Sequence, residues 1–212
     1  MHAHTYHSFD SLLPPCAYLR YALTQQLDFL CITDHNTLAG ARAIARMNTS
    51  PRLQVVIGAE YATDNGDLIG LFLHEDIAER GWSRLIEAIH AQGGVVVLPH
   101  PYRGRDTLDE ELWAAVDLVE VFNARSSAAS NAAALEQARA RGKPQCAGAD
   151  IHTLWELVRT QTFVTLEGAG DLRHQLLAAP RHLSTRTVSR QVRRYSQVIK
   201  RIRRYAGFPG SR

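Results

Sequence analysis

The sequence predicts an α/β protein with a parallel sheet, which is either doubly wound or closed as a barrel. Two observations predict this class. Short apolar runs typical of strands alternate with helix-like segments along most of the chain, and several of these runs contain four to six consecutive apolar residues. Continuous apolar runs are typical of strands buried on both faces, and repeated strand–helix alternation is typical of parallel sheets. Active sites in such folds gather at the carboxyl ends of the strands.

The expected strands are identified by their apolar and β-branched residues. The first, HAHT, is short, whereas later runs such as LQVVIGAEY, DLIGLFL and GVVVLPH are longer and more apolar. In chain order the expected strands cover residues 2–5, 29–34, 53–61, 67–73, 94–100, 118–122, 144–150 and 162–166.

Helix-like segments occupy the intervals between these strands. Ser83 or Asp109 can cap a helix start, and Gly142 before Pro144 is typical of a helix end. Because no low-complexity linker precedes residue 184, we expect one domain over 1–184 and a basic C-terminal helix or tail over 185–212. The expected helices of the domain cover residues 15–27, 38–47, 82–92, 108–115, 128–141 and 171–179.

Length and composition are those of a globular protein. The 212 residues suffice to bury a sizeable core, and hydrophobic residues make up 45% of the chain. No apolar run reaches the roughly 18 residues that predict a membrane span, and the N-terminus lacks a signal-peptide pattern, so we expect a cytoplasmic protein. Cys16, Cys31 and Cys146 lie far apart, which argues against a disulfide framework and against a cysteine-rich zinc site.

Positive charge is concentrated toward the C-terminus. Residues 185–212 contain nine Lys or Arg and no Asp or Glu, although the whole chain carries a formal net charge of only +3. Residues 1–184 are therefore acidic. An acidic body with many histidines favours a cation site over a nucleic-acid groove.

Residues that can bind metal ions stand at the ends of five expected strands. A single histidine at a strand end is more often structural than a ligand. Five strands that share this feature favour a site, because the carboxyl ends of parallel strands meet at one edge of the sheet. These residues are His2 and His4 on the first strand, Asp34 and His35 on the second, Glu60 on the third, His100 on the fifth, and Asp150 and His152 on the seventh.

The spacing of these residues suits shared coordination. Residues i and i+2 of a strand point to the same face, so His2 and His4 can bind one ion together, and Asp150 and His152 can serve the same pocket. Mixed imidazole and carboxylate ligands suit zinc, manganese or iron better than magnesium or calcium. His7 lies at the strand end, and we do not expect it to be a ligand.

An ordered set of motifs resembles the PHP family, the polymerase and histidinol phosphatase domain. The set runs from residue 2 to about residue 153 and consists of H-x-H-T-x-x-S-x-D (2–10), I-T-D-H-N (32–36), G-A-E (58–60), L-P-H-P (98–101) and G-A-D-I-H-T (148–153). The resemblance implies a distorted (β/α)7 TIM-like barrel with parallel strands. It also implies two or three divalent metal ions, Mn, Zn or Fe, at the carboxyl ends of the strands.

The resemblance further implies which residues bind each ion. The implied ligands are His2, His4, Glu60 and Asp150 for one metal, Glu60 and His100 for a second, and Asp10, His35 and His152 for a third.

Two positions depart from the family pattern. Many relatives have a histidine where this chain has Asp67, which can still ligate the second metal through oxygen; His74 is the alternative, although we expect a surface residue there. Relatives often carry an aspartate just before the first histidine, where this chain has Met1. Asp34, in contrast, is expected to orient a neighbouring ligand from outside the metal shell.

The implied reaction is hydrolysis of a phosphoester by a metal-activated water. The expected substrate is a small phosphomonoester, such as a nucleotide or a similar phosphorylated metabolite. A nuclease or exonuclease acting on short oligonucleotides, with the basic tail aiding binding, is the alternative. A non-catalytic binding domain is a third possibility, and the complete ligand set argues against it.

The residues expected to act in catalysis combine ligands with an arginine. His35 or His152 can serve as general acid, and arginines after the strands can hold phosphate in bidentate fashion. Arg125 is the first candidate, followed by Arg103 and Arg105. The expected catalytic residues are Glu60, His35, His152 and Arg125.

The basic tail contains an apolar stripe with helical spacing. Its residues are Val188, Val192, Tyr195, Ile199, Ile202 and Ala206. The stripe predicts a terminal helix docked on the barrel with a solvated basic face. A partner helix in a homo-oligomer, and contact with nucleic acid or an anionic membrane, are the alternatives.

Overall fold

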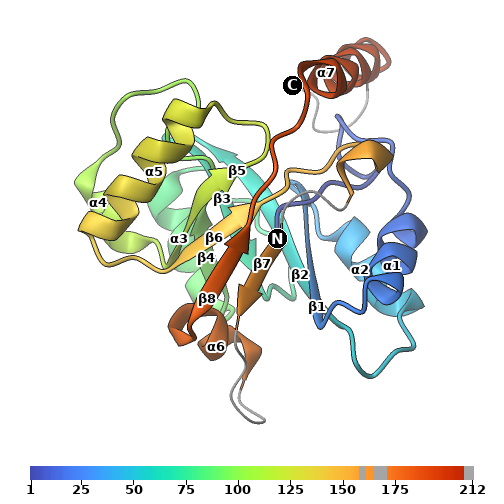
Figure 1. The fold of residues 1–212 in the computed structure, drawn as a ribbon, viewed down its shortest axis with the longest axis horizontal. Coiled ribbons are helices and arrows are strands. Elements are labelled where there is room, and N and C mark those ends of the chain that lie inside the picture. The colour runs from blue at the N-terminus through green and yellow to red at the C-terminus, as the bar shows by residue number, and fades with distance from the viewer. Residues whose placement is uncertain (158–160, 165–170, 208–212) are drawn as a thin grey trace.

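The computed structural model describes residues 1–157, 161–164 and 171–207 (Figure 1). Six strands form one curled sheet in the order β1-β2-β3-β4-β5-β6, and two more form a separate pair, β7-β8. The α/β class and a curled, mostly parallel sheet are thereby confirmed. The strands are β1 (Phe29–His35), β2 (Gln54–Thr63), β3 (Gly66–Leu71), β4 (Val95–Leu98), β5 (Leu118–Asn123), β6 (Gln145–Gly148), β7 (Gln161–Val164) and β8 (Arg181–Ser184).

Helices cover the outer surface of the curled sheet. Helix α2 contacts β1 and β2, α3 contacts β3 and β4, and α5 contacts β5. Helix α4 begins after Asp109, whose side chain makes no capping hydrogen bond, and α3 begins after Gly81 and not after Ser83. The helices are α1 (Pro15–Thr24), α2 (Ala39–Met47), α3 (Trp82–Ala91), α4 (Glu110–Ala115), α5 (Ala128–Ala140), the 3₁₀ helix η1 (Leu154–Glu156), α6 (Leu172–Ala178) and α7 (Arg190–Tyr205).

The interior of the curl is filled by apolar side chains from all six strands. They form one buried cluster, so this end of the sheet is a packed core. Because strand side chains alternate between faces, the interior rows of β1, β2, β3 and β5 lead to polar residues at the carboxyl edge of the sheet. The buried members of the cluster include Cys31, Val56, Ile69, Val97, Leu118 and Cys146.

Strand β3 corrects the expectation that all strands run parallel. It pairs antiparallel with both β2 and β4. Only two residues separate Thr63, the end of β2, from Gly66, the start of β3, and a parallel crossover needs about a dozen residues or more. Gly66 adopts a φ of +94° in this hairpin, a conformation that glycine tolerates without strain. The reversal places Asp67 opposite Ala62, at the same edge of the sheet where the parallel strands end.

The N-terminal segment lies between the two edges of the curled sheet. Residues 2–5 were expected to form a strand, and the structure shows a single parallel bridge between Ala3 and Ile151, the latter just beyond β6. On the other side, the Thr33 amide of β1 donates to the Ala3 carbonyl at 2.9 Å. The segment therefore joins the first and last strands of the sheet, and it carries His2 and His4 on either side of Ala3.

Strand β7 differs from the expected seventh parallel strand. It pairs antiparallel with β8, and its Thr162 hydroxyl bonds both the amide and the carbonyl of Ala147 in β6. Residues 165 and 166, the end of the expected strand, lie outside the described residues. Within the part of the chain that the structure describes, the curled sheet therefore has six strands and does not show the complete (β/α)7 arrangement.

Helix α7 lies above the carboxyl edge of the sheet (Figure 1). The Arg203 guanidinium donates to the carbonyls of Tyr6 and Ser8, and the Val188 amide donates to the Ala124 carbonyl. Of the expected apolar stripe, Val188 and Ile199 are buried, whereas Tyr195 and Ile202 are exposed. The stripe thus only partly faces the body. None of the described helices is both long enough and apolar enough to cross a membrane.

Candidate metal centre

The interior rows of β2, β3 and β5 place carboxylates at one edge of the sheet. Glu60 follows Val56 by four residues, Asp67 precedes Ile69 by two on the reversed strand, and Glu120 follows Leu118 by two. Even spacing keeps each pair on the same face. Glu60 and Glu120 are buried, and Asp67 is partly exposed.

Unusual backbone conformations aim several of the edge residues. His100 has a φ of 31° and Asp150 a φ of 51°, and Asn36, directly after His35, has a φ of 57°. Positive φ is uncommon for residues other than glycine and costs free energy that the surrounding structure must offset. Strain of this kind is concentrated at functional sites. Here the strained conformations produce sharp turns of the chain where the strands end.

The structure brings together all nine side chains expected to bind metals. Histidine nitrogens and carboxylate oxygens within 4.8 Å of one another form four overlapping groups. Compared with the expected sets, His4 also lies with the third group and His2 also lies with His100. The groups are His4, Asp10, His35 and His152; His2, His100 and Asp150; His2, His4 and Glu60; and Glu60, Asp67 and His100.

Three of the imidazoles are held by one nitrogen and present the other to the centre. His2 Nδ1 bonds Glu120 Oε1 at 2.9 Å, and His152 Nδ1 donates to the Asp150 carbonyl at 2.8 Å. His4 Nδ1 lies 3.2 Å from Ser8 Oγ. Because a carbonyl only accepts, Nδ1 of His152 carries the proton, which leaves the Nε2 lone pair free for a metal. Metal-binding histidines are commonly oriented in this way.

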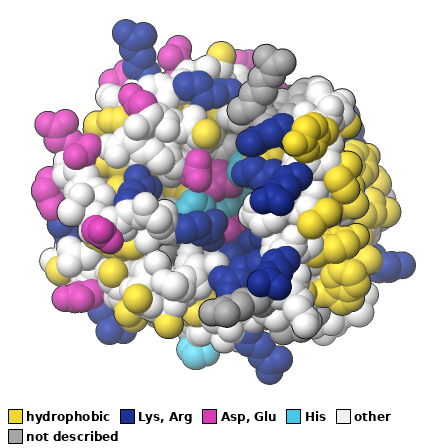
Figure 2. Space-filling view, turned by 90° about the horizontal axis from the view of Figure 1, so that it is seen from above, with side chains coloured by type: hydrophobic (Ala, Val, Ile, Leu, Met, Phe, Trp, Pro, Cys, Tyr) yellow, Lys and Arg dark blue, Asp and Glu magenta, His cyan; other side chains and the backbone are white. Residues whose placement is uncertain are grey.

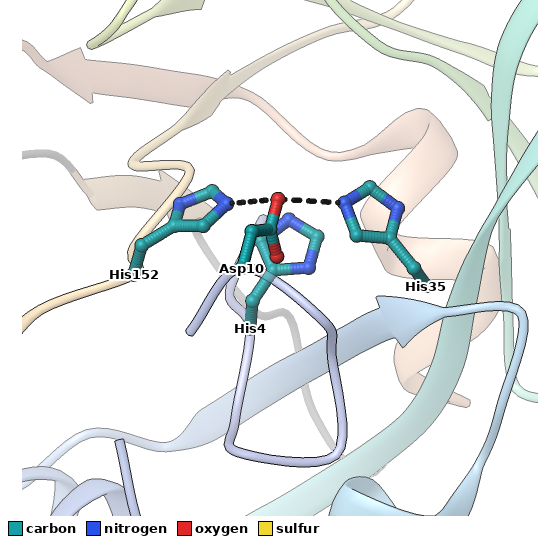
Figure 3. A group of neighbouring side chains, drawn as sticks. All are labelled: His4, Asp10, His35 and His152. Carbon is teal, nitrogen blue, oxygen red and sulfur yellow. Dashed lines mark hydrogen bonds and ion pairs between the residues drawn. The ribbon is translucent and has the colours of Figure 1, made fainter. Parts of the chain in front are cut away.

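Asp10 lies between His35 of β1 and His152, which follows β6 (Figure 3). Its Oδ2 is 3.0 Å from His152 Nε2 and 3.2 Å from His35 Nε2. His35 Nδ1 in turn lies 3.3 Å from Glu60 Oε2. His35 therefore connects the group that contains Asp10 with the groups that contain Glu60.

Two buried atoms of this centre have no hydrogen-bond partner. They are Nε2 of His4 and Oδ1 of Asp10. Burying an unpaired polar atom costs free energy, which a bound cation would recover. The donor set also matches the chemistry of zinc, manganese and iron, which accept imidazole and carboxylate together. The residues present therefore fit divalent cations.

Burial and neighbouring charges shift the protonation of the centre. Burial acts to raise the pKa of Glu60, but the imidazoles of His2 and His35 outweigh it and hold that pKa well below its usual range. Burial, together with His152 and His35, lowers the pKa of His4 to about 3. Burial opposes protonation of His35 as well, yet Glu60 and Asp10 raise the pKa of His35 to about 9.

Glu120 is a functional candidate that the sequence reasoning missed. Besides His2, it accepts at 2.8 Å from both the His100 amide and Asn123 Nδ2. Asn123 also reaches Asp150 Oδ2, at 3.3 Å. The available signal was an acidic residue inside the apolar run LVEVF, because buried carboxylates are rare without partners.

Asp34 orients the first loop from outside the metal groups, as expected from its position. Its carboxylate accepts from the Thr5 amide at 2.6 Å and from the hydroxyls of Thr5 and Ser8 at 2.7 and 2.8 Å. Ser8 in turn accepts from the His35 amide at 2.9 Å. These bonds fix Ser8, which holds His4.

The three candidate arginines occupy different positions. Arg103 donates to Asp150 Oδ2 at 2.8 Å and to Asn123, so its guanidinium lies at the metal groups. Arg105 donates to the carbonyls of Pro101 and Asn65 at 2.8 and 2.6 Å. Burial acts to lower the pKa of Arg105, and the nearby Asp67 opposes that effect.

Arg125 was expected to bind substrate, and in the structure its guanidinium is bonded to other parts of the protein. It pairs with Glu156 Oε1 at 2.5 Å and also bonds Ser196 on α7. Its side chain is only 8% exposed, against 36% for Arg103. The guanidinium is occupied by a buried carboxylate and so faces the protein interior.

Basic side chains lie around the opening of the site. Viewed from above, histidine and acidic side chains lie in a hollow at the centre of the face, with Lys and Arg around them (Figure 2). His7 and His74 belong to none of the metal-binding groups found among the described residues.

The chain is similar in sequence to a known domain family and to two other proteins. The PHP domain family model matches residues 1–167. Two uncharacterized proteins of Methanocaldococcus jannaschii are similar in sequence, one 40% identical over 54% of this chain and 69% of its own length, the other 32% identical over 74% of this chain and 66% of its own length.

Solved structures share the fold. A two-domain protein from Bacteroides vulgatus, described as containing a predicted PHP-like metal-dependent phosphoesterase, superposes with a TM-score of 0.71 at 18% identity, over 93% of this chain and 68% of that protein. PsfC from Pseudomonas syringae superposes with a TM-score of 0.66 at 16% identity, over 97% of each chain.

Proposed function

The chain belongs to the PHP domain family, and on that premise we propose that it is a hydrolase that cleaves phosphate esters with the help of divalent metal ions. The observation that carries the proposal is the orientation of the imidazoles. His2, His4 and His152 are each held at Nδ1, and all three direct Nε2 at carboxylates of the same centre.

The proposed metal-binding residues follow the geometric groups. His2, His4, Glu60 and Asp150 would hold one ion. Glu60 would also serve a second ion with His100 and Asp67, and Asp10, His35 and His152 would hold a third, if three are bound. When bound, such cations lower the pKa of a water molecule and offset the negative charge of a phosphate.

Side chains of the chain itself would bind the substrate and move a proton. We assign the phosphate contact to Arg103 in place of Arg125, because Arg103 lies at the metal groups and is the more exposed of the two. With only two ions bound, a doubly protonated His35 or His152 would not be a metal ligand and would give its Nε2 proton to the leaving oxygen. Asp10 contacts both Nε2 atoms and would orient whichever of them acts.

The preferred substrate is a small phosphomonoester. A hollow that contains histidine and acidic side chains (Figure 2), together with the Arg103 guanidinium at Asp150, suits a compact anion. Cleavage of short oligonucleotides is the second candidate, favoured by the lysines and arginines around the opening (Figure 2) and by the basic helix α7 beside it.

Metal content and a substrate panel test the proposal. Protein purified without a histidine tag should contain two or three equivalents of divalent metal per chain. It should hydrolyse small phosphate monoesters or nucleotides bearing a 3′-phosphate when manganese is added. A folded protein with no bound metal and no turnover would refute the proposal, whereas preferential cleavage of oligonucleotides would replace the first candidate with the second.

A substitution at the shared ligand adds a second test. Glu60→Gln should lower turnover by more than the roughly 10–100-fold that loss of an outer hydrogen-bond partner costs a metal site. Glu87→Gln, at an exposed position of α3, is the matched control and should leave turnover unchanged. Equal activity of the two variants would show that Glu60 is not a residue of the active site.

A further inference from the structure

Helix α7 buries only part of its apolar surface against the body. Ser196 and Ile199 are buried, Val192 is partly buried, and Arg203 reaches the Tyr6 and Ser8 carbonyls. Positions 192, 196, 199 and 203 lie along one helical face, since successive residues turn by about 100°. This inner face also contacts the first loop of the site through Lys200, whose Nζ lies 4.9 Å from the Phe9 ring centroid.

A second apolar row on the same helix remains exposed. Positions 195, 198, 202 and 205 are spaced by three, four and three residues and therefore lie along a neighbouring face. Isolated exposed apolar residues are ordinary, but four large ones in one row on one helix are not. The row, called here the outer stripe, consists of Tyr195, Val198, Ile202 and Tyr205, whose exposed fractions are 46%, 51%, 61% and 93%.

The outer stripe continues onto the neighbouring 3₁₀ helix. The ring of Trp155 in η1 meets the ring of Tyr195 edge to face, with centroids 5.5 Å apart. Trp155 and the adjacent Leu154 are both exposed. The exposed apolar surface is thus contributed by two segments and includes a tryptophan and two tyrosines, residues favoured at membrane–water interfaces.

The charges of α7 itself, which border the outer stripe, all have one sign. Helix α7 contains seven Lys or Arg and no Asp or Glu over Arg190–Tyr205. Arg194 and Arg201 are exposed and lie beside the stripe on the side away from the body. An amphipathic helix with an apolar face and a Lys/Arg-rich polar face is suited to the interfacial region of an anionic bilayer.

We propose that the outer stripe docks on the surface of an anionic phospholipid membrane. A second copy of the chain is a poorer occupant, because stripe-to-stripe packing would bring two basic helices together with no acidic residue on either to offset them. A nucleic acid would pair with the arginines but would leave Val198, Ile202 and Leu154 without apolar contact. A bilayer interface satisfies the charges and the apolar residues together.

Docking by this surface would place the metal centre close to the membrane. Helix α7 lies above the carboxyl edge of the sheet, where the metal groups are (Figure 1). Seen from that side, a hydrophobic area lies beside the lysines and arginines that border the histidine and acidic side chains (Figure 2). The proposal concerns attachment alone and does not depend on the reaction that the centre performs.

Vesicle sedimentation with the full chain tests the proposal. The protein should sediment with vesicles of phosphatidylcholine containing phosphatidylglycerol and not with vesicles of phosphatidylcholine alone, and added salt should weaken the binding. Val198→Ser/Ile202→Ser and Arg194→Gln/Arg201→Gln should each weaken binding about tenfold or more. On vesicle addition the tryptophan emission should shift to shorter wavelength, and Trp155→Phe should abolish that shift.

Matched variants on other surfaces serve as controls. Leu23→Ser/Met47→Ser removes two comparably exposed apolar side chains, and Arg20→Gln/Arg84→Gln removes two exposed charges; both should bind vesicles as the unaltered protein does. Absence of binding to anionic vesicles, or unchanged binding by the stripe variants, would overturn the proposal. If binding is absent, a dimer in sedimentation equilibrium that Val198→Ser/Ile202→Ser dissociates would assign the stripe to a second copy. Oligonucleotide binding weakened by that variant would assign it to nucleic acid.

Discussion

Glu120 shows how one buried carboxylate can set the geometry of several of the residues proposed to bind metal. Its two oxygens accept from the His2 ring, the His100 amide and the Asn123 side chain, at 2.8 to 2.9 Å. Although burial acts to raise the pKa of Glu120, His2 opposes it and leaves the pKa lowered. Glu120 therefore stays ionised and holds His2 so that Nε2 faces Glu60. We regard it as a positioning residue, since it acts through the ligands.

Replacing Glu120 by glutamine should weaken metal binding while the fold persists. A glutamine side chain accepts at only one atom, so its NH₂ group would oppose at least one of the three donors. We expect the affinity for the bound metal to fall by about 10–100-fold in a competitive chelator titration. Glu136→Gln, an exposed change on α5, is the control. If both variants bind metal equally well, Glu120 has no positioning role.

Gly148 leaves the space that Glu120 occupies. A Cβ atom at this position would stand 1.4 Å from Glu120 Oε1 and 3.0 Å from His2 Cβ. Gly148→Ala should therefore displace the carboxylate, lower the free energy of unfolding by about 1–3 kcal/mol and reduce the metal content. Gly81→Ala, where a Cβ meets nothing within 4 Å, should leave both quantities nearly unchanged. Urea unfolding and metal analysis of the two variants measure this, and full metal content in Gly148→Ala would contradict it.

At the level of the elements, α7 is connected to the metal centre through buried polar contacts. Ser196 on α7 bonds Arg125, and Arg125 pairs with Glu156 in η1. Glu156 Oε2 accepts from the His152 and Thr153 amides at 2.7 and 2.8 Å. The helix therefore helps to fix the backbone of a proposed ligand, although the sequence alone marks it only as a basic tail.

Removing the Arg125 charge should lower the stability of the fold and should have little effect on substrate binding. Arg125→Met leaves the carboxylate of Glu156, which is fully buried, without its cation. Breaking a buried pair in this way lowers the free energy of unfolding by about 3–5 kcal/mol. Arg194→Met, at an exposed position of α7, should change it by less than about 0.5 kcal/mol. If the Arg125→Met protein is as stable as the unaltered protein and has a raised KM, Arg125 would instead be assigned to substrate binding.

For the whole molecule, the sequence predicted the class of fold and the gathering of ligands because both depend on local patterns. The apolar runs placed the strands, and parallel strands bring their carboxyl ends together, so His35, Glu60 and His100 could be expected to converge. Position in the chain also identified Asp34 as an orienting residue. These inferences need only periodicity and strand direction.

Features that depend on pairing partners could not be predicted in this way. The antiparallel direction of β3 follows from the two-residue turn between β2 and β3. The apolar runs that predicted the strands carry no information on strand direction. The role of Arg125 depends on Glu156, thirty-one residues away. Which residues of the apolar stripe on α7 are buried depends on which face of the helix contacts the body. Periodicity identifies an apolar face but does not show how much of it another surface covers.

The pH dependence of metal stabilisation is the prediction that involves the whole centre. In the metal-free protein, Glu60 and Asp10 raise the pKa of His35 to about 9, from an ordinary value of 6.5. The stability contributed by this protonated ring is fully present below about pH 6.5 and is lost as the pH rises through about 9. A metal needs the neutral ring, so its affinity should rise over the same interval.

The difference in Tm between metal-loaded and chelator-treated protein should therefore increase from pH 6.5 to pH 9. Saturation at about a hundred times Kd contributes roughly 2.7 kcal/mol, or about 5–10 °C for a chain of this size. Differential scanning fluorimetry across the pH range measures the difference. His35→Gln removes the titrating ring and should flatten the rise, whereas His90→Gln, outside the centre, should not. A difference that stays constant or shrinks with pH would show that His35 does not exchange its proton for a metal.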